Sequence, residues 1–312
     1  MNINLINDIG KALGYKRTDL IEKDLILQRL LSDLSSNPLF SKNFAFKGGT
    51  CLIKAYTGYF RFSEDIDFTY LHQRKLAGLS KKTVSATLSK LETEIADIFV
   101  NIAGKRGFDF KNQKGNRNYM EFGGSNRFVT YKIWYDSVVL KRRTFIKVQI
   151  NFVEEMCFKT ARKRLKTIVI DSKKDMGLLY PEYKVYAKPL YFIVYDKREI
   201  AAEKVRAILT RRGIKARDFF DLYMLHKKFK IEPRDVEKEA VRKIKFAVDM
   251  YDKYRANMTE KAKSGITIND TKSEDEMLLE NVNNEDFYAF KKKLEAYSNR
   301  LLQKFTGWAL DS

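Results

Sequence analysis

The stretch that most constrains the fold runs from residue 44 to residue 70, FAFKGGTCLIKAYTGYFRFSEDIDFTY. It opens with an apolar run, breaks at a glycine pair, continues in a helical pattern from Thr50, and closes on Asp-Ile-Asp-Phe. Because glycine adopts backbone conformations that a side chain would forbid, the pair predicts a tight turn. The expected order is strand, glycine turn, short helix, strand.

The glycine pair and two aspartates of this stretch also predict chemistry. Gly48 and Gly49 precede a helix start, where free N–H groups and the positive end of the helix dipole favour phosphate. Asp65 and Asp67 are two apart in a strand, so their carboxylates project from the same face. Two such carboxylates repel each other unless a cation lies between them, and hard oxygen ligands suit Mg2+ or Mn2+. The combination predicts metal-assisted phosphoryl chemistry.

Each half of the motif alone has an ordinary explanation, a simple turn or a solvated strand edge. Together, at this spacing, they resemble the Gly-Gly/Ser and Asp-x-Asp/Glu signature of the polymerase-β-like nucleotidyltransferases. More closely, residues 47–50 (KGGT) with residues 61–68 (RFSEDIDF) are similar to the AbiEii-type nucleotidyltransferase toxins of abortive-infection and toxin–antitoxin systems. The resemblance implies an α/β (α+β) fold, in which a polymerase-β-like core with a mixed sheet is followed by a mainly helical C-terminal domain.

A second chemical stretch, residues 198–225, predicts a helical hairpin with charged flanks. Lys204 and the glutamate before it resemble the helical lysine motif of the AbiEii-type toxins, and residues 217–221 (RDFFD) resemble their Arg-Asp-x-x-Asp motif. The resemblance implies that Lys204 contacts the nucleotide's phosphates and that Asp218 lies in the active site, orienting the lysine or acting as a base. The outer Arg and Asp of the motif equally suit a helix cap or a salt bridge, and this alternative stays open.

The third carboxylate that the superfamily usually places on a neighbouring strand is missing. Alternating apolar and polar residues predict a strand over 144–153, which pairs with 128–135 in an antiparallel hairpin. Gln149 occupies the position where the acid is expected. In the wider superfamily that acid commonly activates the attacking hydroxyl, so its absence puts the deprotonation step in question. Glu154 and Glu155 are either nearby substitutes or surface charges.

Charge points to a polyanionic partner. The chain has 60 Lys and Arg against 40 Asp and Glu, a net charge of +20, which attracts nucleic acid unless it merely reflects a basic proteome. The densest basic stretch, residues 159–174, suits phosphate binding by counterion release, or a solvated face. Tyrosines that could stack on unpaired bases, or simply pack in the core, follow at positions 180, 183, 186 and 191.

The remaining stretches predict scaffold. A helix opens at Thr18 as its N-cap, and its charged triplet at 22–24 predicts a solvated helix face. Residues 104–126 predict loops and turns. Further helices are expected over residues 1–17, 80–103 and 286–308.

The two cysteines and the lack of long apolar segments bear on location. Cys51 and Cys157 have no Cys or His at metal-ligand spacing, which predicts buried thiols in a reducing compartment. No segment approaches the roughly 20 apolar residues that a membrane helix requires, and the N-terminus lacks a signal-peptide apolar core. We therefore expect a cytoplasmic protein with no membrane contact.

These expectations combine into one hypothesis, with residues 1–190 as nucleotidyltransferase core, residues 191–312 as helical domain, and the active site in the cleft between them. The expected reaction is metal-dependent transfer of a nucleoside monophosphate from an NTP to an acceptor hydroxyl, with release of pyrophosphate. The metal would bind Asp65 and Asp67. The nucleotide would be held by Lys47, Gly48, Gly49, Thr50 and Lys204.

The resemblance implies a growth-blocking toxin that a cognate antitoxin counters, and a chemistry similar to that of tRNA 3′-end nucleotidyltransferases. The net charge favours an RNA acceptor, most simply the tRNA 3′ end, over a protein hydroxyl. Two alternatives stay open. One is a non-catalytic nucleic-acid-binding protein on a degenerate nucleotidyltransferase core, which would account for Gln149. The other is a nucleotidyltransferase that acts on a protein or a small molecule.

Overall fold

The computed structural model describes residues 1–124, 127–168, 176–267, 277–279 and 285–308. The chain forms two compact units, Met1–Val153 with Thr160–Val194, and Glu154–Lys159 with Tyr195–Ser312. The expected domain boundary at residue 190 stays a prediction. Residues 169–174 of the basic stretch lie outside the described residues.

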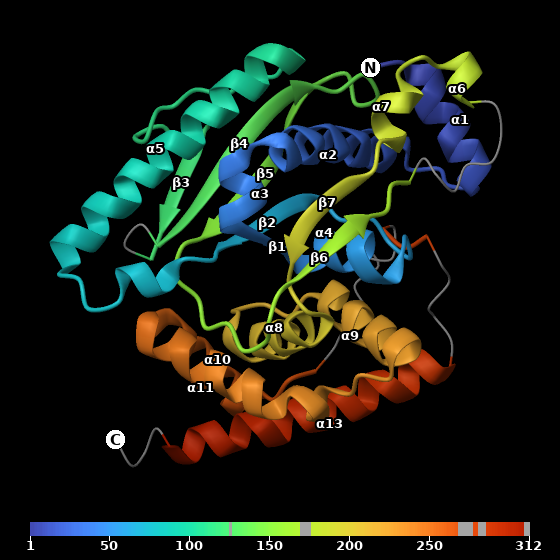
Figure 1. Ribbon diagram of the computed structural model, residues 1–312. Coiled ribbons are helices and arrows are strands. Elements are labelled where there is room, and N and C mark those ends of the chain that lie inside the picture. The colour runs from blue at the N-terminus through green and yellow to red at the C-terminus, as the bar shows by residue number, and fades with distance from the viewer. Residues whose placement is uncertain (125–126, 169–175, 268–276, 280–284, 309–312) are drawn as a thin grey trace. The chain divides into compact units, whose positions relative to one another are not determined.

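A seven-stranded mixed sheet forms the centre of the first unit, in the order β3-β4-β5-β2-β1-β7-β6 (Figure 1). Strand β1 runs antiparallel to β2 and parallel to β7, and β2 runs parallel to β5. The other neighbours are antiparallel. This mixed sheet confirms the predicted fold class. Its strands are β1 Phe44–Lys47, β2 Asp65–Tyr70, β3 Met120–Gly123, β4 Phe128–Asp136, β5 Arg143–Asn151, β6 Ala161–Leu165 and β7 Leu190–Val194.

Helices cover the apolar face of this sheet. Aromatic contacts join Phe40 of α3 to Phe68 of β2, at 5.3 Å between ring centroids, and Phe99 of α5 to Tyr131 of β4, at 5.0 Å. Burial of these large rings stabilises the packing of helices on that side. The helices of this unit are α1 Ile3–Leu13, α2 Thr18–Ser36, α3 Pro38–Asn43, α4 Gly48–Leu52, α5 Lys81–Arg106, α6 Met176–Leu179 and α7 Tyr183–Ala187, with a π-helical turn at Ile53–Thr57 and a 3-10 turn at Gln73–Leu76.

Two local expectations need correction. Thr18 is the first residue of α2 rather than its cap, and Arg17 occupies the cap position without a capping side chain. The region 104–126 contains strand β3, whose Phe122 lies opposite Val129 of β4. Four residues are too few to show a period in the sequence, so the pairing with β4 decides their conformation.

The charged triplet at 22–24 is not a solvated face. Glu22 and Asp24 are only 1% and 2% exposed. Glu22 accepts a hydrogen bond from the backbone N–H of Val138 at 2.7 Å, and Asp24 pairs with Lys54 Nζ at 3.0 Å. Buried carboxylates require such partners, and both partners come from distant parts of the chain.

The second unit is mainly helical in its described residues, as predicted. Phe220 of α9 stacks on Phe287 of α13 with ring centroids 4.8 Å apart. None of the helices that the structure describes is long and apolar enough to span a membrane. The helices are α8 Lys197–Thr210, α9 Ala216–Phe229, α10 Glu237–Met250, α11 Asp252–Ser264 and α13 Glu285–Trp308, with a 3-10 turn at Pro233–Val236.

Candidate active site

The first unit brings the glycine pair and the two aspartates into contact. Helix α4 begins at Gly48, whose φ of +77° is left-handed. A Cβ at this position would overlap with the carboxylate of Asp67. One at Gly49 would lie 2.5 Å from Nη2 of Arg61, a buried side chain whose role the sequence did not predict. Both glycines are therefore required by close approach, and Gly48 lets the Asp67 carboxylate lie against the turn.

The alternation of β2 follows the prediction. Ile66 and Phe68 are fully buried, while the intervening aspartates are half-buried. Just before Asp65, Glu64 pairs with Lys23 of α2 at 2.6 Å, Nζ to Oε1. The start of β2 is thus fixed to α2, with the two aspartates projecting from the other side of the strand from the aromatic core.

Thr50 connects α4 to the aspartate strand. Its side chain is buried, and its hydroxyl donates to the backbone carbonyl of Asp65 and lies 2.8 Å from Ser63 Oγ. The structure therefore gives Thr50 a positioning contact with the strand that carries Asp65 and Asp67. Its contact with a triphosphate stays a prediction.

A row of polar residues crosses the sheet at Asp67. Lys47 of β1 and Gln149 of β5 lie directly opposite Asp67 on its two neighbouring strands. Gln149 in turn lies opposite Thr130 of β4 and donates to its hydroxyl at 3.3 Å. The register confirms that Gln149 stands beside the aspartate strand, where the third carboxylate was expected. Directly opposite residues project from the same face, so all four side chains belong to one polar face of the sheet.

The donor set fits a magnesium ion that is shared with a nucleotide. Among the residues that the structure describes, no cluster of three or more His, Cys, Asp or Glu side chains could hold a metal. Mg2+ does not need such a cluster, because it is commonly bound by one or two carboxylates, waters and the phosphates of the substrate. Asp65 and Asp67 supply the carboxylates, and α4 begins beside them.

We expect Gly48→Ala to disrupt this arrangement. The added methyl group displaces the Asp67 carboxylate and forces a non-glycine residue into φ +77°. The matched control is Gly78→Ala, which has the same φ of +77° but no atom within 4 Å of the new Cβ. Both variants carry the backbone cost of about 1–2 kcal/mol. Only Gly48→Ala should also lose nucleotide transfer, measured beside thermal unfolding, and equal activity in the two variants would contradict the placement.

In the second unit, Lys204 of α8 lies between two aspartates of α9. Its Nζ is 2.7 Å from Asp218 Oδ1 and 2.6 Å from Asp221 Oδ2. The two aspartates are three residues apart on a helix, so they share a face. Arg211 completes the group at 2.7 Å from the other oxygen of Asp218. The structure thus brings Lys204 and Asp218 together, and it shows the outer Asp of the motif in a salt bridge.

The environment of Asp218 determines its protonation. Burial raises the pKa of this carboxyl, but the positive charges of Lys204 and Arg211 outweigh burial and hold the pKa well below its usual range. Asp218 is therefore ionised at neutral pH and is a weak proton acceptor. Its contacts suit the orientation of Lys204 better than general-base catalysis, for which a pKa near the working pH is best.

The lowered pKa of Asp218 predicts a pH dependence of stability. A carboxyl whose pKa is lower when folded stabilises the protein fully above its unfolded pKa of about 4, and this stabilisation is lost as the pH falls through the folded value. We expect Asp218→Asn to lower the free energy of unfolding at pH 7, and the difference from the wild type to shrink steadily as the pH falls below about 4 toward the folded pKa. Urea unfolding across pH measures this, with the exposed Asp249→Asn as control. A constant difference at all pH values would contradict it.

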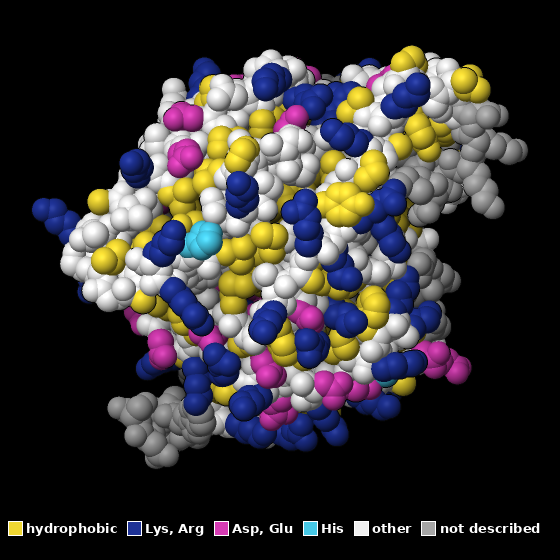
Figure 2. All heavy atoms as spheres, in the orientation of Figure 1, with side chains coloured by type: hydrophobic (Ala, Val, Ile, Leu, Met, Phe, Trp, Pro, Cys, Tyr) yellow, Lys and Arg dark blue, Asp and Glu magenta, His cyan; other side chains and the backbone are white. Residues whose placement is uncertain are grey.

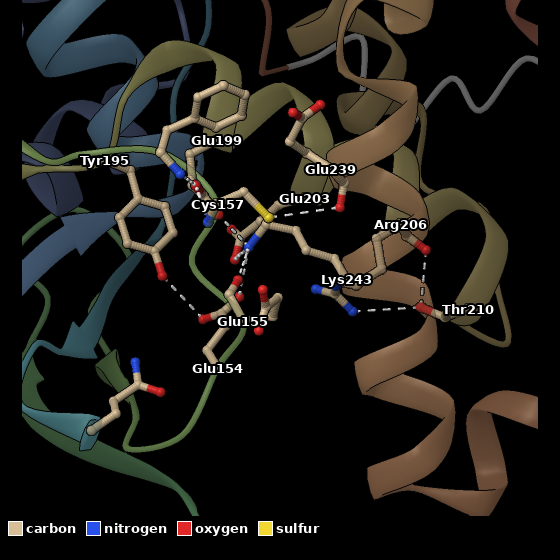
Figure 3. Close-up of polar contacts among 12 residues, drawn as sticks. Glu154, Glu155, Cys157, Tyr195, Glu199, Glu203, Arg206, Thr210, Glu239 and Lys243 are labelled. Carbon is tan, nitrogen blue, oxygen red and sulfur yellow. Dashed lines mark hydrogen bonds and ion pairs between the residues drawn. The ribbon is translucent and has the colours of Figure 1, made fainter. Parts of the chain in front are cut away.

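A second buried cluster, around Lys243 of α10, was missed by sequence reasoning (Figure 3). The Lys243 Nζ lies 2.5 Å from Glu199 Oε1 and within 3.7 and 3.8 Å of Glu154 and Glu203. Burial lowers the pKa of Lys243, but the three glutamates outweigh it and raise the pKa. The cluster fixes α8 beside the segment 154–159. The only sequence signal was the four-residue spacing of Glu199 and Glu203, which places both on one face of a helix.

The segment 154–159 alters two expectations. Glu154 is neither a surface charge nor shown to replace a third carboxylate, since its side chain is largely buried and pairs with Lys243. Glu155 pairs with Arg242. Cys51 is buried as predicted, whereas Cys157 is only partly buried, and burial raises its pKa to about 11.

The predicted site residues therefore form two groups, one in each compact unit. Lys47, Gly48, Gly49 and Thr50 lie with the two aspartates of β2, and Lys204 lies with Asp218. Their meeting in one cleft stays a prediction.

Comparisons with known proteins give the following. The model of the family described as nucleotidyl transferase AbiEii toxin, type IV TA system, matches residues 29–310. Among solved structures, the chain is similar to MenT4, a nucleotidyltransferase toxin from Mycobacterium tuberculosis H37Rv, at 16% identity and a TM-score of 0.48, over 95% of this chain and 88% of MenT4. It is also similar to JHP933 from Helicobacter pylori, at 16% identity and a TM-score of 0.43, over 96% of this chain and 100% of JHP933. No curated protein matches the chain.

Proposed function

Because the chain belongs to the AbiEii nucleotidyl transferase toxin family of type IV toxin–antitoxin systems, we propose that it transfers a nucleoside monophosphate to the 3′ end of tRNA. The family implies an NTP substrate and a cognate antitoxin. In the proposed reaction the acceptor 3′ oxygen forms a bond to the α-phosphorus of the NTP. The bond from that phosphorus to the bridging oxygen of the β-phosphate breaks, pyrophosphate leaves with that oxygen, and the proton of the acceptor hydroxyl passes to solvent water.

One observation carries this proposal. The carboxylate of Asp67 lies against Gly48, at the point where α4 begins. Backbone N–H groups at a helix start favour phosphate oxygens, and the adjacent carboxylates favour the cation that accompanies those phosphates. If the glycine turn and the aspartate strand had separate structural purposes, the Asp67 carboxylate would not need to lie in contact with Gly48.

Asp65 and Asp67 would hold Mg2+ or Mn2+ together with the phosphates. A cation held there would supply charge stabilisation for the transferring phosphoryl group and the departing pyrophosphate. The chain's own part is to fix the two carboxylates on a rigid strand, through the Thr50 hydroxyl bond to the Asp65 carbonyl and through the buried Ile66 and Phe68. Lys47, Gly48 and Gly49 would contact the phosphates beside them.

Lys204 would contact the nucleotide's phosphates as a cation whose position is set by Asp218 and Asp221. A lysine that is held by two buried carboxylates loses little conformational freedom when phosphate binds, which favours binding. Asp218 would act through Lys204, in keeping with its low pKa.

Gln149 limits how the acceptor proton can leave. A carboxamide is a hydrogen-bond partner but not a base at neutral pH, and Gln149 already donates to Thr130. Phosphoryl transfer passes through a loose transition state in which positioning and charge stabilisation dominate, so strong general-base catalysis is not essential. We propose that Gln149 orients the acceptor hydroxyl through its amide oxygen.

The net charge of +20 supports an RNA acceptor over a protein or small molecule, because a polyanion is attracted most strongly by a positively charged protein. A tRNA acceptor and NTP donor also favour the cytoplasmic location that the sequence predicts.

The test incubates the purified full-length chain with Mg2+, total tRNA and each radiolabelled NTP in turn, beside an Asp65→Ala/Asp67→Ala control. We expect label on tRNA with one preferred nucleotide and none with the control. Label on protein or on a small molecule would overturn the acceptor. RNA binding without any label would favour a non-catalytic binding protein, with Gln149 as the physical reason.

A further inference from the structure

The basic stretch that begins at residue 159 contains the edge strand β6, which the function above leaves unused. Strand β6 is the last strand of the described sheet and pairs with β7. Arg162 and Arg164 on this strand are exposed. Figure 2 shows Lys and Arg side chains gathered on the visible side of the molecule where β6 and β7 lie.

The register shows which face of the sheet these arginines share. Phe46 of the apolar face lies opposite Val194 of β7, and Val194 lies opposite Ala161 of β6. Side chains alternate along a strand, so the residue after Ala161 on β6 and the residue before Val194 on β7 project from the opposite face. That face is the polar face that carries Asp67. Arg162 and Arg164 belong to that polar face.

The register also places Arg162 at the same end of the sheet as the catalytic carboxylates. Strands β1 and β7 end there, and β2 and β6 begin there. Three strand spacings of about 4.8 Å, with the offset along β6, put the two arginines about 15–20 Å from Asp67. Stacked nucleotides rise about 3.4 Å each, so this distance corresponds to about four to six nucleotides.

An exposed aromatic ring lies beside the arginines on the neighbouring strand β7. Tyr191 of β7 is opposite Arg164, is 47% exposed, and has the Arg162 guanidinium 6.0 Å from its ring centroid. Neither arginine is ion-paired with an acidic side chain among the residues that the structure describes. Two unpaired guanidinium groups beside an exposed ring suit phosphates and an unpaired base.

We propose that Arg162, Arg164 and Tyr191 form the binding surface for the unpaired strand of an acceptor RNA, a few nucleotides before its reacting 3′ hydroxyl. The inference rests on the proposed function, because it takes the polar face near Asp67 as the place of reaction. An acidic protein would also be attracted by the positive charge of the two arginines. The exposed ring beside the arginines, on the face that carries the catalytic aspartates, favours RNA.

The test measures binding of fluorescent tRNA to the full-length chain over a salt series. Arg162→Ala/Arg164→Ala should weaken binding about tenfold and reduce the slope of log Kd against log salt by about 1.4, since each lost single-strand phosphate contact removes about 0.7. The charge-matched control is Lys81→Ala/Lys82→Ala, which removes two exposed lysines at the start of α5. Arg162→Lys/Arg164→Lys should restore most of the slope of log Kd against log salt, because it keeps both charges. It also serves as a control that the edge strand tolerates substitution at these two positions.

Tyr191 supplies an independent readout. We expect Tyr191→Ala to weaken binding of single-stranded RNA several-fold and to leave duplex RNA unaffected, whereas Tyr191→Phe, which keeps the ring, should bind like the wild type.

Three results would overturn the inference. Equal losses of tRNA affinity in the arginine and lysine variants would mean that tRNA is attracted by the overall positive charge and not by this surface. Competition by poly-L-glutamate as strong as that by RNA of equal charge would mean a surface for acidic protein. An unchanged RNA KM in Arg162→Ala/Arg164→Ala, with transfer intact, would refute the surface and leave the proposed function standing. Arginine-dependent tRNA binding without any transfer by the wild type would support the surface and refute the proposed function.

Discussion

Asp67→Asn should abolish nucleotide transfer while the chain stays folded. The substitution keeps the shape of the side chain against Gly48 but removes the charge that would hold the cation. A bound metal contributes several kcal/mol of charge stabilisation, and each 1.36 kcal/mol is a factor of ten, so kcat should fall at least about 10³-fold. Loss of one of two neighbouring carboxylates also relieves repulsion, and the amide keeps the size of the side chain, so the chain should remain folded at the assay temperature.

The control for this experiment is Asp136→Asn, which removes the same charge from an exposed position at the end of β4. It should transfer nucleotide at the wild-type rate. Initial rates at saturating Mg2+ and NTP, with thermal unfolding of each variant, make the comparison. Asp67→Asn activity within tenfold of the control would show that the metal site was assigned to the wrong residues.

Lys204→Met is expected to have the largest effect on both stability and activity in the second unit. It removes the cation that lies between Asp218 and Asp221, which are 1% and 0% exposed. Removal of one partner from a buried charge group costs about 3–5 kcal/mol, because the remaining charge is left without compensation. Loss of a phosphate contact in the transition state should lower kcat by about 10²-fold or more.

A second substitution separates these two effects. Asp221→Asn in the Lys204→Met background removes the buried charge that has lost its salt bridge, while Asp218 keeps Arg211 at 2.7 Å. The double variant should therefore recover most of the lost free energy of unfolding but none of the activity. Urea unfolding and transfer rates are measured on both variants, with the exposed Lys238→Met as control. Recovery of activity along with stability would show that Lys204 is only structural.

The elements that local sequence predicted well are those with strong local causes. The order strand, glycine turn, helix and strand follows from residues within 27 positions of one another, and the structure forms it as β1, α4 and β2. The two-residue alternation in β5 placed Gln149 on the polar face, and the register with β2 sets it beside Asp67. Long amphipathic helices such as α5 and α13 were predicted for the same reason, since a repeated period outweighs single exceptions.

The features that only the tertiary structure decided depend on residues that are far apart in sequence. Glu22 has the polarity of a surface residue, yet it is buried because Val138, more than 100 positions away, supplies its hydrogen bond. The spacing of Glu199 and Glu203 puts both on one face of a helix but does not show that Lys243 pairs with them, and no local pattern shows that the pKa of Asp218 is lowered. The burial of a side chain, its pKa and the face from which it projects on an edge strand all depend on neighbours that only folding brings together. The sequence by itself therefore determined the motif and its local order of elements, and it predicted the chemistry of the motif. The tertiary structure decided which charges are buried, how they pair, and that Arg162 and Arg164 share a face with Asp67.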